Sequence, residues 1–298
     1  MKKLGEYLLA NNMRAAIVAF LCTLLPLIAL PGGFIAAIIV GLVTISKGSK
    51  AGLFVLAFVA LPAISLLVLR QFEYGLFDIL LARCILVWIF ALILRRWNSW
   101  TLVLEIMAVV GVVAVIIVHL FVPDIKQIWT TALTHYYKEF ALSGLLQLTP
   151  EKTASFINHV VPFATGSAAF LLFFGIFVQL LLARWWQSVI FLPGSFRQEF
   201  ITIRVDRIAA VILIAATVGI CWQPSWLIDL YPVLLLPFMV AGLSIVHRIT
   251  ANRKEMIFLV ATMYIALVIL NFIVIALLAL VGLIDSWANF RKQQRQLA

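Results

Sequence analysis

The sequence predicts an all-α protein: a bundle of helices that crosses a membrane eight or nine times, with amphipathic surface helices in one outer loop. Of its 298 residues, 65% are hydrophobic and 11% are charged, whereas soluble domains have about 45–50% and about 25%. A water-soluble domain of this size has no way to hide so much apolar surface, so lipid is expected to surround most of it. Residues 1–298 are therefore predicted to form a single integral membrane domain.

The net charge of +10 would suggest a nucleic-acid partner in a soluble protein. Here most Lys and Arg residues fall in connections on one side of the predicted spans, as the positive-inside rule describes. The expected partner is therefore membrane lipid and not a nucleic acid. The same rule predicts a multi-pass protein of the bacterial cytoplasmic (inner) membrane with its amino terminus in the cytoplasm.

Residues 1–122 form the predicted amino-terminal half. Residues 1–14 are expected to make a short amphipathic helix on the cytoplasmic face, although a cleaved signal peptide would begin in a similar way. Apolar runs follow at 15–30, 34–46, 51–69, 77–94 and 101–122. The first two are short for a bilayer that needs about 20 helical residues, so they are expected to tilt or to form a half-buried hairpin.

Residues 123–160 are the longest polar insertion, and the charge pattern places them outside. Apolar residues between Ile125 and Phe140 recur at helical spacing, which predicts an amphipathic helix. Thr149, Pro150 and Glu151 are typical of the N-cap and first turn of a second short helix. Such helices lie flat on a leaflet or cap a bundle, and gating of a solute is the alternative.

Residues 161–298 form the predicted carboxyl-terminal half, with apolar runs at 161–183, 208–221, 227–246 and 256–284. Pro232 and Pro237 are expected to kink the third of these runs. Nine crossings would leave the basic carboxyl tail outside. Either the tail is an exception to the charge rule, or one apolar run does not cross.

Residues 184–207 are predicted to be a cytoplasmic loop between the two halves, with a turn at Pro193-Gly194. Its arginines could pair with acidic groups of a membrane or cytoplasmic protein partner, while its phenylalanines fill an apolar groove. The alternative is anchoring, with Trp at headgroup level and Arg on anionic lipid. The expected docking residues are Arg184, Trp185, Trp186, Gln187, Pro193, Gly194, Phe196, Arg197, Glu199, Phe200 and Arg204.

Four ionisable residues within or at the ends of spans are candidate solute-binding groups: Asp78, Arg83, His119 and Asp229. Such groups cost about 2.5–3.5 kcal/mol each on insertion scales, so each suggests a site. Arg83 keeps its proton and needs a carboxylate, a carbonyl or an anionic ligand. If the four side chains converge, they form a polar pocket that opens outward. Asn271, in the last run, is expected to join helices by hydrogen bonding.

Patterns typical of enzymes are absent from the sequence. The 4 histidines and 3 cysteines have no metal-ligand or disulfide spacing. No phosphate-binding loop, nucleophile elbow or dinucleotide fingerprint is present. No cofactor or metal is therefore expected, and the protein is not expected to be an enzyme.

Several segments carry a family resemblance. They are Arg-Trp-Trp-Gln at 184–187, Pro-Gly-Ser-Phe-Arg-Gln-Glu-Phe at 193–200 with Arg204, and the stretches 41–48 and 282–291. They resemble the YybS-like family of uncharacterised bacterial multi-spanning membrane proteins. That family is distantly similar to the S components of energy-coupling-factor vitamin transporters and to the shape-determining protein MreD.

Two functions follow from these observations. The first is a component that binds or transports a small solute and docks a partner through residues 184–207. The alternative is a non-transporting scaffold for cell-envelope or division machinery, in which Arg83 is neutralised inside the protein. An ATP-driven role would require a partner chain, because the sequence has no nucleotide-binding motif.

Overall fold

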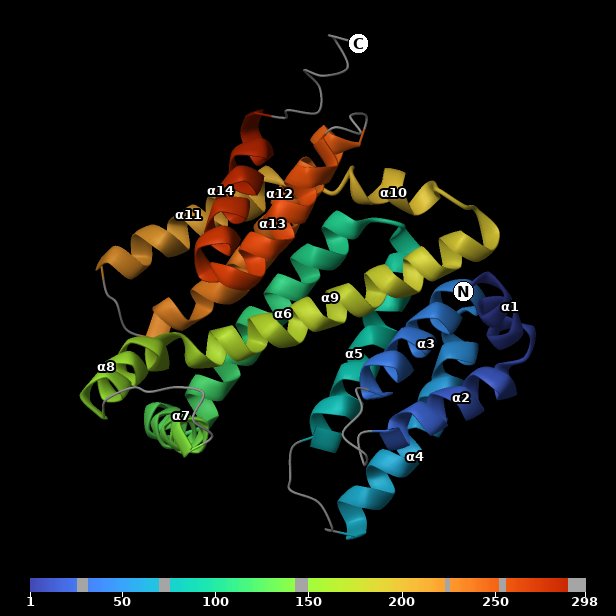
Figure 1. The fold of residues 1–298 in the computed structure, drawn as a ribbon, viewed down its shortest axis with the longest axis horizontal. Helices are drawn as coiled ribbons and strands as arrows, with labels where there is room; N and C mark the ends of the chain where they lie inside the picture. Colours follow the sequence, from blue (N-terminus) through green and yellow to red (C-terminus); the bar gives the residue numbers. More distant parts are fainter. Residues whose placement is uncertain (26–31, 70–75, 143–149, 223–225, 252–255, 289–298) are drawn as a thin grey trace. The chain divides into compact units, whose positions relative to one another are not determined.

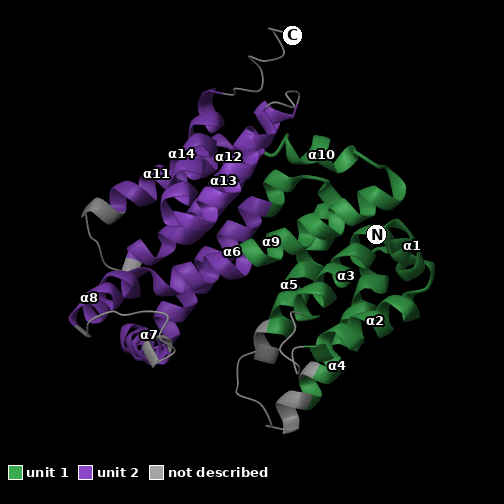
Figure 2. Ribbon diagram, in the orientation of Figure 1, with its two compact units in different colours: residues 1–103, 174–203 green, residues 104–173, 204–298 purple. Residues whose placement is uncertain are grey.

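The computed structural model describes residues 1–25, 32–69, 76–142, 150–222, 226–251 and 256–288. Within these ranges every regular element is a helix (Figure 1), which confirms the all-α prediction. The chain divides into two compact units (Figure 2). Unit 1 comprises Met1–Val103 and Phe174–Ile203, and unit 2 comprises Leu104–Phe173 and Arg204–Ala298.

Unit 1 is built around α3, in which every residue from Ala36 to Ile45 is buried. This helix packs against α2, α4 and α5. Gly52 of α4 allows one of these contacts, because a Cβ atom there would lie 2.0 Å from the hydroxyl oxygen of Thr44. The helices of the unit are α1 (Lys2–Ala10), α2 (Asn12–Leu24), α3 (Gly32–Lys47), α4 (Ser49–Leu69), α5 (Leu76–Trp97), the end of α9 (Ala164–Phe191) and α10 (Ser195–Phe200).

The predicted amphipathic helix at 1–14 is interrupted at Asn11, where the helix axis bends by 114° between α1 and α2. Asn11 has an extended backbone, and its side chain accepts a hydrogen bond from the Met13 N–H at 2.9 Å. This is the behaviour of an N-cap residue. Across the bend, the Arg14 guanidinium lies 4.8 Å from the centre of the Tyr7 ring. A local capping interaction therefore divides the predicted helix in two.

Unit 2 has its closest helix pair in α12 and α14. A Cβ atom on Gly242 would lie 2.0 Å from the Leu278 carbonyl oxygen, and one on Gly282 would lie 2.1 Å from that of Phe238. Small residues that let two backbones meet are typical of helix pairs in membranes. The helices are the rest of α6 (Trp100–Phe121) and of α9, with α7 (Ile125–Leu142), α8 (Pro150–Val160), η2 (Val161–Phe163), α11 (Arg207–Trp222), η3 (Trp226–Leu230), α12 (Tyr231–Thr250), α13 (Ile257–Ile269) and α14 (Phe272–Ala288).

The last apolar run, at 256–284, folds as two helices with Asn271 between them. Asn271 has a φ angle of 24°, in a region that Asn enters more readily than most residues. Figure 1 shows the start of α13 and the end of α14 at the same end of unit 2. Asn271 therefore occupies a turn between two short arms, where the sequence had suggested a residue joining neighbouring helices.

Three helical stretches among the described residues are long and apolar enough to cross a membrane: Trp100–Phe121, Glu151–Phe191 and Leu227–Thr250. The bent pair α1–α2 would add a fourth. Eight or nine spans are not supported, because several apolar runs form helices of only 10–17 residues, whereas a bilayer needs about 20. These short helices are Gly32–Lys47, Ser49–Pro62, Arg207–Gly219, Ile257–Ile269 and Phe272–Ala288.

The helices predicted in the insertion 123–160 are present. α7 begins at Ile125, and α8 begins at Pro150, as the first-turn preference of proline suggested. Helical structure then continues through η2 and α9 as far as Phe191. The predicted sixth span at 161–183 thus ends too early, and residues 184–191 belong to a helix.

The contact between α12 and α14 can be tested with Gly282→Ala. The added methyl group meets the Phe238 carbonyl oxygen and forces the helices apart, at an expected cost of about 1–3 kcal/mol. The matched control is Gly219→Ala on α11, where a Cβ atom has no neighbour within 4 Å. Thermal unfolding in detergent should show a lower Tm for Gly282→Ala only. Equal Tm values for the two variants would contradict the close contact.

Candidate functional site

The strongest polar constellation in unit 2 surrounds Asp229, whose side chain is only 3% exposed. Oδ2 of Asp229 lies 2.9 Å from Nε2 of His119, in the last turn of α6. Oδ1 accepts a hydrogen bond of 2.6 Å from the backbone N–H of Gly166, in the first turn of α9. One carboxylate therefore joins α6, α9 and η3. Both predicted residues of this cluster, His119 and Asp229, are brought together.

Gly166 makes the approach to Asp229 possible. A Cβ atom at this position would lie 1.6 Å from the Asp229 carbonyl oxygen and 3.0 Å from Oδ1. Any side chain would therefore push η3 away from α9 and lengthen the hydrogen bond to the carboxylate. Glycine is needed here for close backbone approach.

Part of the surroundings of the His119–Asp229 pair is apolar. Leu230, which follows Asp229, packs in a buried cluster with Val115 of α6 and Val233 of α12. An apolar surrounding strengthens the interaction between charged or polar groups and raises the cost of leaving one unpaired. His119 is the more accessible partner, with 18% of its side chain exposed. The histidine of the pair is thus partly accessible to solvent, whereas the carboxylate is buried.

Trp129 of α7 adds a second polar contact beside the carboxylate. Its indole N–H donates to the hydroxyl oxygen of Thr165 at 2.9 Å, and Thr165 precedes Gly166 in the chain. The amphipathic spacing of α7 marks Trp129 only as an apolar residue. The sequence prediction therefore did not include Trp129, Thr165 or Gly166. A signal for Thr165 was present, because it is a polar residue near the start of a long apolar run.

The other two predicted solute-binding residues belong to unit 1. The side chain of Asp78 lies outside the described residues. Arg83, on α5, faces Gly175 of α9, where a Cβ atom would lie 3.8 Å from the guanidinium carbon. The convergence of all four side chains in one pocket stays a prediction.

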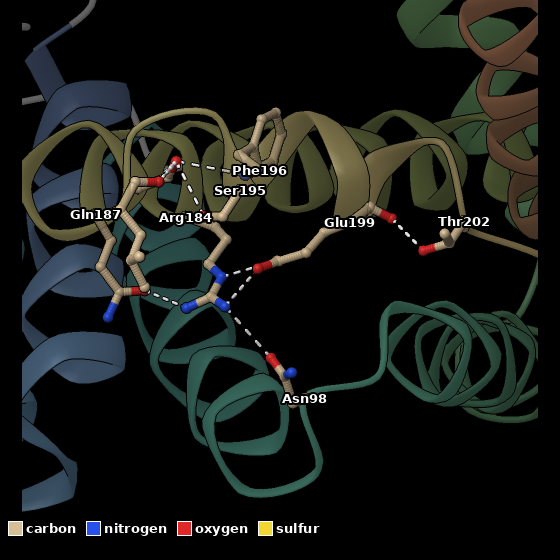
Figure 3. Close-up of polar contacts among 9 residues, drawn as sticks. Asn98, Arg184, Gln187, Ser195, Phe196, Glu199 and Thr202 are labelled. Atoms are coloured by element: carbon tan, nitrogen blue, oxygen red, sulfur yellow. Dashed lines mark hydrogen bonds and ion pairs between the residues drawn. The ribbon is translucent and has the colours of Figure 1, made fainter.

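Several polar side chains of residues 184–200 find hydrogen-bond partners within unit 1. The Arg184 guanidinium donates two hydrogen bonds to the Glu199 carboxylate, at 2.9 and 2.7 Å (Figure 3). It also donates to the Gln187 side-chain oxygen and, at 3.4 Å, to that of Asn98. The two-pronged ion pair holds α10 against the end of α9. Its members are only about one-fifth exposed, at 22% and 23%.

The predicted turn at Pro193-Gly194 is present, and Gly194 has a φ angle of 92°. Ser188 closes this turn, because its hydroxyl group donates to the Leu192 carbonyl at 3.0 Å and accepts from the Phe196 N–H at 3.4 Å. Glycine takes up the left-handed conformation at little cost. The chain thereby reverses from α9 into α10.

The two tryptophans of the segment have different surroundings. Trp186 is buried, and its indole N–H donates to the Met1 carbonyl oxygen at 3.0 Å. Trp185 is 37% exposed, as expected for a residue at an interface. Phe196 and Phe200 stack on each other, with ring centres 6.2 Å apart. Arg197 is exposed.

Arg204 belongs to unit 2 and binds the end of α14. It donates to the backbone carbonyl oxygens of Asp285 at 3.2 Å and Ser286 at 2.8 Å, and its Nε lies 3.9 Å from the Asp285 carboxylate. The last carbonyl groups of a helix lack partners within the helix and carry partial negative charge. Arg204 therefore acts as a C-terminal cap for α14.

The constraint at Gly166 predicts that Gly166→Ala disrupts the Asp229 cluster. Its added methyl group has no space, so we expect destabilisation of about 2–4 kcal/mol and a lower Tm. Gly175→Ala on the same helix is the matched control, because its methyl group meets the Arg83 side chain at ordinary contact distance. That control should be neutral or more stable by up to about 1 kcal/mol. A stable Gly166→Ala protein would contradict the geometry described for Asp229.

The Arg184–Glu199 ion pair can be measured by a double-mutant cycle. Arg184→Ala, Glu199→Ala and the double variant should give a coupling energy of about 1–2 kcal/mol, between the values for exposed and buried pairs. Chemical denaturation in detergent supplies the unfolding free energies. A coupling near zero would mean that Arg184 and Glu199 act independently.

No family model, no curated protein and no solved structure matches this chain. The resemblance to the YybS-like family therefore stays a prediction.

Proposed function

We propose that the protein is a multi-pass membrane protein that binds a small polar solute at the His119–Asp229 pair and acts as a solute-binding or transport component. The observation that carries the proposal is the nearly complete burial of the Asp229 carboxylate beside a partly exposed histidine. A buried ionic pair contributes little net stability compared with apolar packing. Ionisable groups in membrane helices accordingly mark solute paths and proton relays.

The chemistry of the pair indicates which solute it would take. An ionised carboxylate only accepts hydrogen bonds, and each oxygen has more than one lone pair. We propose that the solute either displaces His119 from Asp229 or binds beside it, because His119 is the partly exposed partner. The expected solute therefore carries a donor, such as an ammonium, amide or hydroxyl group, which takes up free lone pairs of Asp229. Apolar residues such as Val115 and Leu230 would pack against its carbon skeleton.

The same proposal assigns the sides of the membrane. We place the amino terminus and residues 184–207 in the cytoplasm of a bacterial cell, because basic connections stay inside. The turn at Asn271 supports an arrangement in which α14 ends on the same side as the start of α13, because Figure 1 shows both at the same end of unit 2.

A partner is proposed to dock on the exposed part of the segment around α10. Arg184 and Glu199 already bind each other, and Arg204 binds α14. The Phe196–Phe200 stack, with the exposed Arg197 beside it, is the surface that supports a docking role. An aromatic and arginine combination is typical of residues that carry binding energy.

Solute binding is tested on the full chain in lipid nanodiscs with a panel of small amines, amides and polyols. At least one solute should raise the Tm of the wild type, because a ligand at 100 times its Kd stabilises by about 2.7 kcal/mol. Asp229→Asn should abolish this shift. Glu105→Gln, an acid elsewhere on α6 that accepts from the Asp206 N–H at 3.2 Å, should retain it.

The alternative is a non-transporting scaffold, in which the His119–Asp229 pair only joins helices. In that case no solute in the panel raises the Tm, and Asp229→Asn lowers the stability of the protein without changing any response to solutes. Affinity purification from native membranes then separates the roles further. Envelope or division proteins would accompany a scaffold, and an ATPase pair would accompany a transport component.

A further inference from the structure

A second polar site lies in unit 1, where α5 meets the end of α9. Arg83 projects from α5 towards Gly175 of α9. From the position of a Cβ atom on Gly175, the guanidinium carbon and Nη2 are each 3.8 Å away and Nη1 is 4.0 Å away. Nearly equal distances mean that the flat face of the guanidinium lies over Gly175. The N–H groups of Arg83 therefore do not point at Gly175.

Gln179 faces the same interface. It lies one turn after Gly175 and one turn before Ala183, so all three share a face of α9. Ala183 lies 3.1 Å, and Val87 of α5 lies 3.2 Å, from the position of a Cβ atom on Gly41. Val87 is one turn beyond Arg83 on α5. Gln179 therefore lies on α9 between Gly175, which faces Arg83, and Ala183, which approaches Gly41 beside Val87.

Three polar atoms of this site have no hydrogen-bond partner within the part of the chain that the structure describes. Gln179 is 0% exposed, and neither its amide nitrogen nor its oxygen makes a hydrogen bond there. Nε of Arg83 is buried and also makes no hydrogen bond to a described residue. Buried polar groups in native proteins are rarely left unpaired. An unpaired Gln179 amide on the same interface as an unpaired Nε–H of Arg83 therefore points to a group that the described residues do not supply.

We propose that Arg83 and Gln179 form a binding site for an oxyanion, a carboxylate or phosphate group of a small solute or of a lipid. The guanidinium edge binds two oxygen atoms of such a group in parallel, and it stays charged at any physiological pH. The Gln179 amide adds a donor for a third contact, and its oxygen accepts from a neighbouring hydroxyl or ammonium group of the ligand. Both residues belong to unit 1, whereas His119 and Asp229 belong to unit 2, and this proposal does not depend on the proposed role of that pair.

An internal counter-ion is the competing interpretation of Arg83. Asp78, whose side chain is not described, precedes Arg83 by five positions on α5. Five residues correspond to a rotation of about 140° around a helix, so the two residues lie on different faces. The described residues contain no carboxylate that pairs with Arg83.

The test uses the full chain in nanodiscs, with sodium phosphate and sodium acetate compared with sodium chloride at equal ionic strength. One oxyanion should raise the Tm in a saturable manner. Arg83→Gln should weaken this binding by at least about tenfold, because charge-assisted hydrogen bonds are lost. Gln179→Leu should weaken it severalfold and, without the anion, should raise the Tm, because two unpaired polar atoms are removed.

Two control variants distinguish the oxyanion site from a general effect of charge and from an internal ion pair. Arg95→Gln, on the same helix, should respond as the wild type does, because Arg95 already donates to the Ile45 carbonyl at 2.6 Å. Asp78→Asn should also leave the response unchanged. A wild type that ignores both anions, combined with an Asp78→Asn variant that gains a response, would overturn the proposal in favour of an internal ion pair.

The source of the oxyanion is decided by adding phosphatidylglycerol to the nanodiscs in place of the soluble salts. A saturable shift with soluble phosphate or acetate identifies a free solute, whereas an Arg83-dependent shift with the lipid alone identifies a headgroup. If neither changes the Tm, the site does not bind oxyanions. Asp229→Asn should leave every one of these responses intact, so the failure of one proposal is distinguishable from that of the other.

Discussion

A carboxylate buried among apolar helices must find its hydrogen-bond partners within the protein, and in unit 2 the contacts of Asp229 meet this requirement. His119 reaches it from the end of α6, and the Gly166 N–H reaches it from the start of α9. The contact with α9 depends on a glycine, since a side chain at 166 has no space beside the Asp229 carbonyl. Three elements that are distant in sequence are thereby held at one polar point, and the proposed solute site follows from that arrangement.

The same requirement explains the segment that follows α9. The sequence allows Arg184 to bind anionic lipid or an acidic partner. In the structure its guanidinium instead makes a two-pronged ion pair with the carboxylate of Glu199, fifteen residues later. Arg204 likewise binds carbonyl oxygens at the end of α14, where unpaired acceptors and the helix dipole favour a cation. These arginines stabilise the protein internally. The surface on which we propose that a partner docks is therefore smaller and more aromatic than the amino-acid composition of 184–207 indicates.

Gln179 departs from this pattern and is informative for that reason. Its amide is fully buried and unpaired among the described residues, and the neighbouring Arg83 has a buried N–H without a described partner. Other buried polar groups differ among themselves: the indole N–H of Trp129 donates to Thr165, whereas that of Trp100 makes no hydrogen bond to a described residue. The contrast between satisfied and unsatisfied sites in one chain gives the oxyanion proposal its physical basis.

Composition and hydrophobic periodicity were sufficient to predict an all-α protein, the amphipathic α7 and the start of α8 at Pro150. The cost of placing charges in lipid was sufficient to single out His119 and Asp229. The breaks at Asn11 and Asn271, the extension of α9 past residue 183 and the Arg184–Glu199 pair required the tertiary structure. Periodicity reports only which faces are apolar, whereas the end of a helix and the partner of a side chain depend on contacts between residues far apart in sequence. For the same reason, the sequence suggested a pocket of four ionisable residues, and only the folded chain decided that His119 and Asp229 meet.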